Sequence, residues 1–258
     1  MGLDLYAGTL TRYYAHNWKT AVEQWAEANG YTFNRITPEG DAIPDEEVPP
    51  AEIQAGVEGW RDQLLAALAQ PGRAPYAPWP EDNDRPYYTD KPDWDAFGAM
   101  LLVAACRSYG EPVPATVPKN WDFAGHPLIA RLAEDEEKIW SLFRGTTWWL
   151  PLPDGFLFQG PLPNGGQAVI ATTAGLRMEL EHLNELAWRA DEGTILGWSE
   201  TEGYPVDGAA PAGGVFSMAD IPEDTRYDTQ SLAKFAFSMF WQALRFAEQN
   251  QVPILLDY

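Results

Sequence analysis

The strongest constraint on the fold comes from residues 228–258 of the printed sequence. Asp228 is a suitable N-cap, and the residues after it predict a helix from about residue 229 to residue 250. Apolar residues recur there at steps of three and four and cover most of the helix surface: Leu232, Phe235, Ala236, Met239, Phe240, Ala243, Leu244, Phe246 and Ala247. A helix that is apolar on nearly every side is normally buried at the centre of a domain. Pro253 blocks further helix and residues 254–256 predict a short strand, so this segment is expected in the core of an α+β protein.

The rest of the chain predicts more helices than strands. A strand is expected over residues 2–10, where apolar and polar residues alternate, and we expect it to join the sheet that holds the strand at 254–256. A further strand is possible over residues 31–36. Amphipathic spacing and caps predict helices over residues 18–29, 51–70, 94–109, 127–143 and 174–190. Proline, glycine and acidic residues predict exposed loops over 37–50, 71–92 and 192–221.

Three apolar runs between residues 147 and 171 are separated by the turn sequences Asp154-Gly155 and Asn164-Gly165-Gly166, which predicts a three-stranded antiparallel meander. The expected fold is therefore α+β: a mostly helical single domain with a small, largely antiparallel sheet. This sheet would include the N- and C-terminal strands and the hairpin meander near 147–171. Because strands and helices do not alternate regularly, a doubly wound parallel sheet is disfavoured. One domain over residues 1–258 is the first expectation, and a division near residue 120 is the second.

The charge of the chain restricts its partners. It has 38 acidic and 17 basic residues, which gives a formal net charge of -21 at pH 7. Such a charge repels nucleic acid phosphates and anionic lipid headgroups, and it favours a basic protein partner. A hydrophobic content of 45%, with 12 Trp and 11 Phe, argues against disorder for most of the chain. We therefore expect a folded protein that binds neither nucleic acid nor membrane.

Cys106 is the single cysteine of the sequence, so it cannot form an internal disulfide. It follows an apolar run at residues 100–105, which predicts a buried and unreactive thiol. The sequence opens without a signal-peptide pattern, and no apolar run approaches the ~18 residues of a membrane span. We expect a cytoplasmic protein.

Catalytic motifs are weak. Glu179 and His182 have the spacing that di-iron bundles use for two ligands, but the motif occurs once and Glu185 lies on the same helix face, so a solvated acidic face explains it. The other histidines, His16 and His126, lie in no recognisable nucleophile motif, and no glycine loop precedes a helix to hold phosphate. The sequence therefore predicts neither a metal nor a cofactor.

Acidic tracts beside proline- and aromatic-rich loops give the leading functional hypothesis. Interfaces favour Tyr and Trp anchors surrounded by charge, and acidic patches accelerate capture of basic partners. We expect a non-enzymatic protein-binding module, with the composition of a bacterial immunity protein that neutralises a basic toxin. The residues expected at the contact surface are Asp45, Glu46, Glu47, Trp79, Glu81, Asp82, Asp84, Tyr87, Tyr88, Trp198, Glu200 and Glu202. One Trp of the pair Trp148-Trp149 is also expected to face outward, because a strand alternates its side chains.

The alternative hypothesis is a carbohydrate-active hydrolase. Glycoside hydrolases place two carboxylates across a sugar whose ring stacks on Trp or Tyr. Residues 198–204, which include Glu200 and Glu202, or Trp94-Asp95 together with Trp79, would supply such groups. A structural subunit of a larger assembly is a third hypothesis, which an exposed apolar edge would support.

Overall fold

The computed structural model describes residues 3–31, 49–72, 74–138, 140–204, 222 and 224–258. Within these residues the chain is a mixed α/β protein whose strands form two sheets. The helices are α1 (Leu10–Tyr14), α2 (Ala21–Ala28), α3 (Pro50–Leu68), α4 (Trp94–Tyr109), α5 (Pro127–Glu134), the 3-10 helix η1 (Ser141–Phe143), α6 (Thr173–Ala187), α7 (Glu192–Thr201) and α8 (Thr229–Asn250). The strands are β1 (Asp4–Ala7), β2 (Tyr88–Asp90), β3 (Thr116–Pro118), β4 (Trp148–Leu150), β5 (Leu157–Pro161), β6 (Gln167–Thr172), β7 (Arg226–Asp228) and β8 (Ile254–Asp257).

The larger sheet has six strands in the order β2-β1-β8-β4-β6-β5, and β3 and β7 form a separate antiparallel pair. β8 lies between β1 and β4 and is antiparallel to both, which confirms the prediction that the first and last strands belong to one sheet. β4 and β6 are parallel, with Trp148 opposite Ile170 and Leu150 opposite Thr172. The predicted meander over 147–171 is therefore wrong: β5 and β6 form a hairpin, but β6 and not β5 pairs with β4. The prediction of a mostly helical protein with a small sheet fits this mixed six-stranded sheet only roughly.

Both faces of the sheet are covered by apolar side chains. On one face, Leu5 of β1, Trp149 of β4 and Leu256 of β8 join a cluster with α4, α6 and α8. On the other face, Tyr6 and Trp148 join residues of α1 and α3. Trp148 is 6% exposed and Trp149 is 0% exposed, so the expectation that one of them faces solvent is wrong. Alternation sends one ring to each face, and each face is packed.

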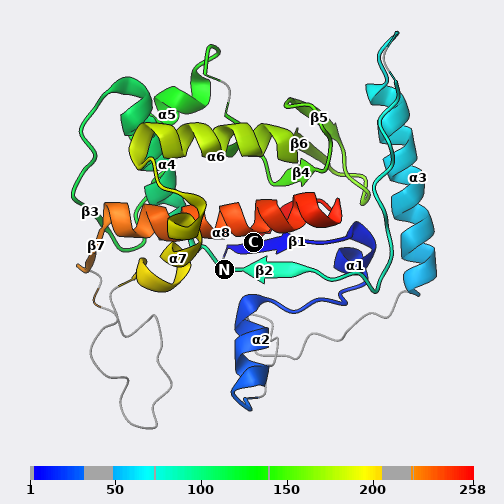
Figure 1. The fold of residues 1–258 in the computed structure, drawn as a ribbon, viewed down its shortest axis with the longest axis horizontal. Helices are drawn as coiled ribbons and strands as arrows, with labels where there is room; N and C mark the ends of the chain where they lie inside the picture. Colours follow the sequence, from blue (N-terminus) through cyan, green and yellow to red (C-terminus); the bar gives the residue numbers. More distant parts are fainter. Residues whose placement is uncertain (1–2, 32–48, 73, 139, 205–221, 223) are drawn as a thin grey trace.

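Helix α8 crosses the middle of the sheet face that carries Leu5, Trp149 and Leu256, and it lies beside α6 and α4 (Figure 1). Asp228 caps its first turn by accepting a hydrogen bond from the Ser231 backbone N–H at 2.7 Å. The ring of Phe240 stacks on Phe97 of α4 with centroids 5.7 Å apart, and it meets the edge of Trp149 from the sheet below. The predicted bounds and the central position of this helix are both confirmed.

Other predicted helices differ at their ends. The helix expected over 127–143 ends at Glu134, and η1 follows only at Ser141. Residues 134–137 are four consecutive acids, and negative charge is unfavourable at the C-terminus of a helix. The segment expected as helix 18–29 gives the shorter α2, which starts at a capping box formed by Thr20 and Glu23.

The segment 192–221 was expected to be a loop, but its first part forms α7, which packs against α8. The possible strand at 31–36 lies almost entirely outside the described residues, as do residues 37–48 and 205–221 of the predicted loops. In the part of the chain that the structure describes, no helix has the length and apolar character needed to cross a membrane.

Candidate binding cleft

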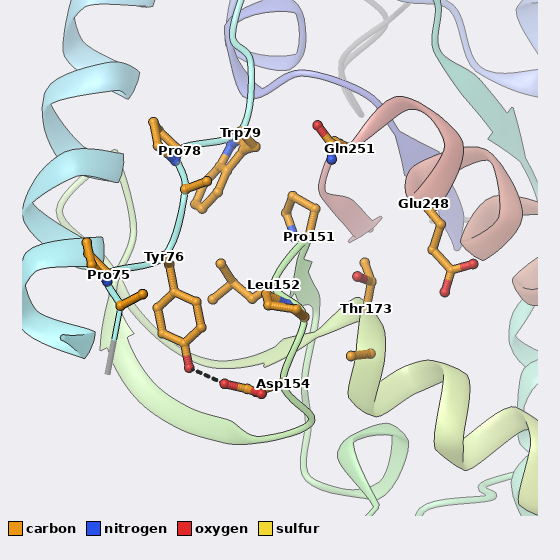
Figure 2. Close-up of a pocket in the computed structure, with 14 residues that line it drawn as sticks. Pro75, Tyr76, Pro78, Trp79, Pro151, Leu152, Asp154, Thr173, Glu248 and Gln251 are labelled. Carbon is orange, nitrogen blue, oxygen red and sulfur yellow. Dashed lines mark hydrogen bonds between the residues drawn. The ribbon is translucent and has the colours of Figure 1, made fainter. Parts of the chain in front are cut away.

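An open cleft of about 800 Å³ is formed by four segments that are distant in the sequence (Figure 2). One wall is the extended chain that follows α3, and another is the loop that leaves β4. The start of α6 and the end of α8 complete it. The lining residues are Ala74, Pro75, Tyr76, Ala77, Pro78, Trp79, Pro151, Leu152, Pro153, Asp154, Thr173, Ala174, Glu248 and Gln251.

The cleft lies at the carboxyl ends of the parallel strands β4 and β6. Pro151 directly follows β4, and Thr173 directly follows β6. Thr172 joins the two ends: its hydroxyl donates to the Asp154 backbone carbonyl at 2.7 Å and accepts from the Gly175 N–H at 3.1 Å, which caps α6. In open α/β sheets, ligands bind in the crevice outside the carboxyl ends of parallel strands. The position of this cleft therefore matches a common location of binding sites.

Prolines keep the 74–80 wall extended, because each fixes its own φ and removes a backbone donor. Trp79 anchors this wall to α3. Its carbonyl accepts a hydrogen bond of 2.6 Å from Arg61, and its ring meets the edge of the Trp60 ring at 6.2 Å. Trp79 is only 3% exposed, so Tyr76 is the aromatic ring that the wall presents more openly.

The charged groups of the lining are two carboxylates. Asp154 accepts a hydrogen bond of 2.8 Å from the Tyr76 hydroxyl, and it faces the cleft from below (Figure 2). Glu248 extends from the last turns of α8 and pairs with Arg177 of α6. Among the described lining residues there is no lysine or arginine. The cleft combines apolar proline and aromatic rings with negative charge.

Two of the predicted contact residues between 79 and 88 lie inside the molecule, Trp79 and Glu81. Trp79 donates from its indole Nε1 to Glu81 at 2.9 Å, and Glu81 is 5% exposed. The Glu81 carboxylate also accepts hydrogen bonds from the Leu10 and Thr11 backbone N–H groups at 3.3 and 2.9 Å. Burial raises the pKa of Glu81, and the hydrogen bonds from Thr11, Trp79 and Leu10 oppose that rise. These side chains join α1 to the proline-rich wall.

The neighbouring predicted residues are more accessible. Asp82 holds its loop by accepting from the Arg85 N–H at 2.7 Å and pairing with the Arg85 guanidinium at 2.8 Å. Asp84 is exposed. Tyr87 is half-buried and accepts a hydrogen bond from the Lys19 N–H, and Tyr88 donates to Asp90 at 2.7 Å.

The predicted contact residues in α7 and directly after it do not line the cleft. Trp198 is buried, and its ring meets Trp188 and Phe237 at 5.3 and 6.0 Å, whereas Glu200 is exposed. Glu202 forms a 2.7 Å ion pair with Lys234. Asp45, Glu46 and Glu47 lie outside the described residues. Of the predicted contact residues that the structure describes, Trp79 is the one that lines the cleft.

Trp94-Asp95 and Trp79, one of the two sets of groups suggested for a hydrolase, are not brought together. Trp94 packs with the α4 and α8 cluster, and Trp79 packs on the opposite face of the sheet. Asp95 is buried and accepts a hydrogen bond of 2.9 Å from the Asn120 N–H. Burial raises the pKa of Asp95.

Glu179 and His182 do not converge on one point. The Glu179 carboxylate accepts from the backbone N–H of Ser141 at 2.6 Å, while the His182 ring lies against Trp140 at 5.5 Å. The described residues contain no cluster of three or more His, Cys, Asp or Glu that is arranged to hold a metal ion. Cys106 is buried, as predicted, and burial raises the pKa of its thiol.

Tyr76, Asp154, Glu248 and Gln251 were not predicted as site residues. The loop that carries Tyr76 was recognisable from its length and its prolines, and a long loop of this kind often has a function. Asp154 was interpreted as part of a hairpin turn, and Glu248 was not singled out. No family model, curated protein or solved structure matches the chain.

Proposed function

We propose that this chain is a non-enzymatic acidic protein that binds a basic protein, as a bacterial immunity protein binds a toxin, and that its cleft receives a basic side chain of the partner. The observation that carries the proposal is the lining of the cleft, in which the charged side chains among the described residues are the carboxylates of Asp154 and Glu248. A lysine or arginine inserted there would meet negative charge at its tip and apolar rings along its stem. A cytoplasmic location stays part of this proposal.

The size and walls of the cleft favour a side chain with its flanking backbone. Its volume of about 800 Å³ lies in the usual range of ligand sites, but it is open along one side. Tyr76 and the prolines at 75, 78 and 151 provide flat, rigid surfaces, which proteins often use to bind extended segments. The net charge of -21 would steer a basic partner toward this surface.

The test compares two double variants with the same change of net charge. Asp154→Asn with Glu248→Gln removes both carboxylates of the cleft, and Asp84→Asn with Glu200→Gln removes two exposed acids outside it. A partner is first captured at low salt from lysate of the source cells and identified, and its binding to each variant is then measured by calorimetry. We expect a basic partner whose affinity falls at least about tenfold with the cleft variant and less than about threefold with the control.

Equal affinities of the two variants would exclude the cleft as the contact site, and an acidic partner would contradict the proposal as a whole. A larger loss of affinity with the control variant would indicate that the partner binds the acidic residues predicted from the sequence instead of the cleft. Circular dichroism of both variants verifies that the fold is retained.

The hydrolase is the second candidate, because the cleft places Asp154 and Glu248 in one hollow with the Tyr76 ring. If the cleft is a glycoside hydrolase site, a glycan panel will give turnover that is abolished by either Asp154→Asn or Glu248→Gln alone. Stoichiometric binding without turnover would reject it.

A further inference from the structure

A second pocket, separate in its lining from the cleft, lies between α6, η1 and the start of β5. Its volume is about 440 Å³. A cavity of about 150 Å³ already accommodates benzene, so this pocket has room for a small ligand with one ring. Six of the residues that line it have no polar side chain: Gly155, Phe156, Leu157, Ala171, Gly175 and Met178. The two others are Ser141 and Glu179, so one ionisable group faces an otherwise largely apolar space.

The Glu179 carboxylate is fixed in position by η1. Its Oε2 accepts hydrogen bonds from the Ser141 hydroxyl at 2.9 Å and from the Leu142 backbone N–H at 3.3 Å. Its Oε1 accepts one, from the Ser141 backbone N–H at 2.6 Å. Since each carboxylate oxygen has two lone pairs, Oε1 keeps one acceptor position after these bonds are counted. The Ser141 hydroxyl is fixed in turn, because it accepts a hydrogen bond of 2.8 Å from the Trp149 indole.

The charge of this carboxylate has no cationic partner among the described residues. Arg177, on the same helix, pairs with Glu248 and reaches Glu181. His182, one turn further along, packs on Trp140. No lysine or arginine belongs to the described lining of the pocket. An ionised carboxylate in low-dielectric surroundings is stabilised by a positive charge, which a cationic ligand would supply here.

We propose that this pocket binds a small primary amine, whose ammonium group pairs with Glu179 and whose apolar body lies against Phe156, Leu157 and Met178. A short charge-assisted hydrogen bond to Oε1 would provide the orientation, and the apolar wall would select a hydrophobic body. The site shares no lining residue with the cleft, so it stands independently of the proposed function.

The pKa of Glu179 predicts how amine binding will depend on pH. Burial raises the pKa of Glu179 to about 7, against the opposing effect of the hydrogen bonds from Ser141 and Leu142. The groups that contact the carboxylate from η1 are neutral, and β6 and residues 155–157 contribute no charged side chain to the pocket wall. Because an ammonium pairs with the ionised carboxylate, amine binding is expected to strengthen between pH 6 and pH 8.

The experiment titrates the 15N-labelled full chain with benzylamine and with benzyl alcohol, a neutral molecule of similar shape. The indole N–H signal of Trp149 is the reporter, because that group donates to Ser141 beside Glu179. We expect benzylamine to shift this signal and to bind at least about tenfold tighter than benzyl alcohol at pH 8, with the preference reduced at pH 6.

Two variants distinguish the loss of the binding site from the loss of the fold. Glu179→Gln keeps one amide oxygen toward η1 but removes the charge, so the preference for the amine over the alcohol is expected to disappear. Gly155→Leu replaces none of the groups that contact Glu179, and the backbone φ of Gly155 is not in the left-handed region. A Cβ at this position would lie 3.0 Å from the Met178 sulfur and 3.4 Å from the Gly175 Cα, so the new side chain would crowd the pocket. It is expected to reduce binding of both molecules by at least about tenfold.

Equal binding of benzylamine and benzyl alcohol would overturn the proposal, as would the lack of any shift with benzylamine at about 10 mM. A folded Glu179→Gln variant that keeps the preference would also overturn it. If Glu179→Gln does not fold, Gly155→Leu decides: benzylamine affinity equal to that of the unmodified chain places the amine elsewhere.

Discussion

Replacing Glu81 with alanine tests whether a buried carboxylate holds the proline-rich wall of the cleft to the N-terminus of α1. The carboxylate accepts four hydrogen bonds: from the Leu10 and Thr11 backbone N–H groups, the Thr11 hydroxyl and the Trp79 indole, at 2.9 to 3.3 Å. It closes the first turn of α1 from outside that helix, so its loss would affect two segments at once.

The expected loss of stability follows from the hydrogen-bond donors that are left without the Glu81 carboxylate. The Thr11 hydroxyl can rotate toward another acceptor, but two backbone N–H groups and the indole N–H cannot. A buried donor without an acceptor costs about 1–3 kcal/mol, and water that enters the space left by the side chain will recover part of this. We expect Glu81→Ala to lower the free energy of unfolding by about 4 kcal/mol, a large part of the 5–15 kcal/mol typical of a domain. Glu81→Gln keeps one acceptor oxygen and is expected to cost about 2 kcal/mol.

Urea unfolding followed by tryptophan fluorescence measures these changes, and Asp84→Ala is the matched control, since it removes an exposed acid from the same loop. The control is expected to stay within about 0.5 kcal/mol of the unmodified chain. If Glu81→Ala destabilises by less than about 1 kcal/mol with an unchanged m-value, the assigned role of the carboxylate is refuted.

Three further predictions concern the helices. Phe237 is fully buried against the rings of Trp188 and Trp241, so Phe237→Ala is expected to cost about 4 kcal/mol in urea unfolding, and a loss below about 2 kcal/mol would contradict the packing described. Gly110 ends α4 at φ 69° with open space around it, so Gly110→Ala is expected to cost about 1 kcal/mol through backbone strain alone. The same replacement at Gly56, inside α3, is expected to stabilise by about 0.5–1 kcal/mol, and melting temperatures that move in the same direction for both would refute the comparison. The pKa of Glu179 rises on folding from its ordinary 4.5 to about 7, so the folded chain binds this proton more tightly than the unfolded chain. The Glu179 contribution to the free energy of unfolding therefore falls as pH increases from 4.5 to 7, and subtracting the pH profile of Glu179→Gln should isolate it.

Elements with local signals could be predicted from the sequence. The bounds of α8 follow from an N-cap at Asp228 and a proline at 253, and those of α4 follow from Asp93 and Gly110. Each signal acts within a few residues of the helix end that it determines. The burial of α8 was also predictable, because its apolar residues cover most of its surface.

The pairing of β4 was not predictable in the same way. Turn residues such as Asp154-Gly155 indicate where the chain changes direction, but they do not specify which strand lies alongside. The fully apolar run at Trp148–Leu150 is typical of a strand buried on both faces, and it was interpreted as one member of a meander. Helix α7 was missed because its glycines and threonines favour a loop, and the packing of Trp198 against Trp188 and Phe237 outweighs that local preference.

The cleft could not be predicted from the sequence at all. Tyr76, Asp154, Thr173 and Glu248 are brought together by the fold, and neither their spacing nor their local sequence relates them. The acidic loops around residue 82 were recognisable, but their composition does not distinguish Glu81, which turns inward, from Asp84, which is exposed.

The position of β8 has a consequence for the synthesis of the protein on the ribosome. β8 joins the β1–β2 pair to the β4–β6–β5 group, yet all five of those strands leave the exit tunnel before it does. Until residues 254–257 emerge, β1 and β4 each keep an open hydrogen-bonding edge, and strands with such edges are prone to pair with other chains. The nascent chain would therefore depend on chaperones until its sheet is closed, and a message that lost the codons for β8 would yield two separated halves of a sheet.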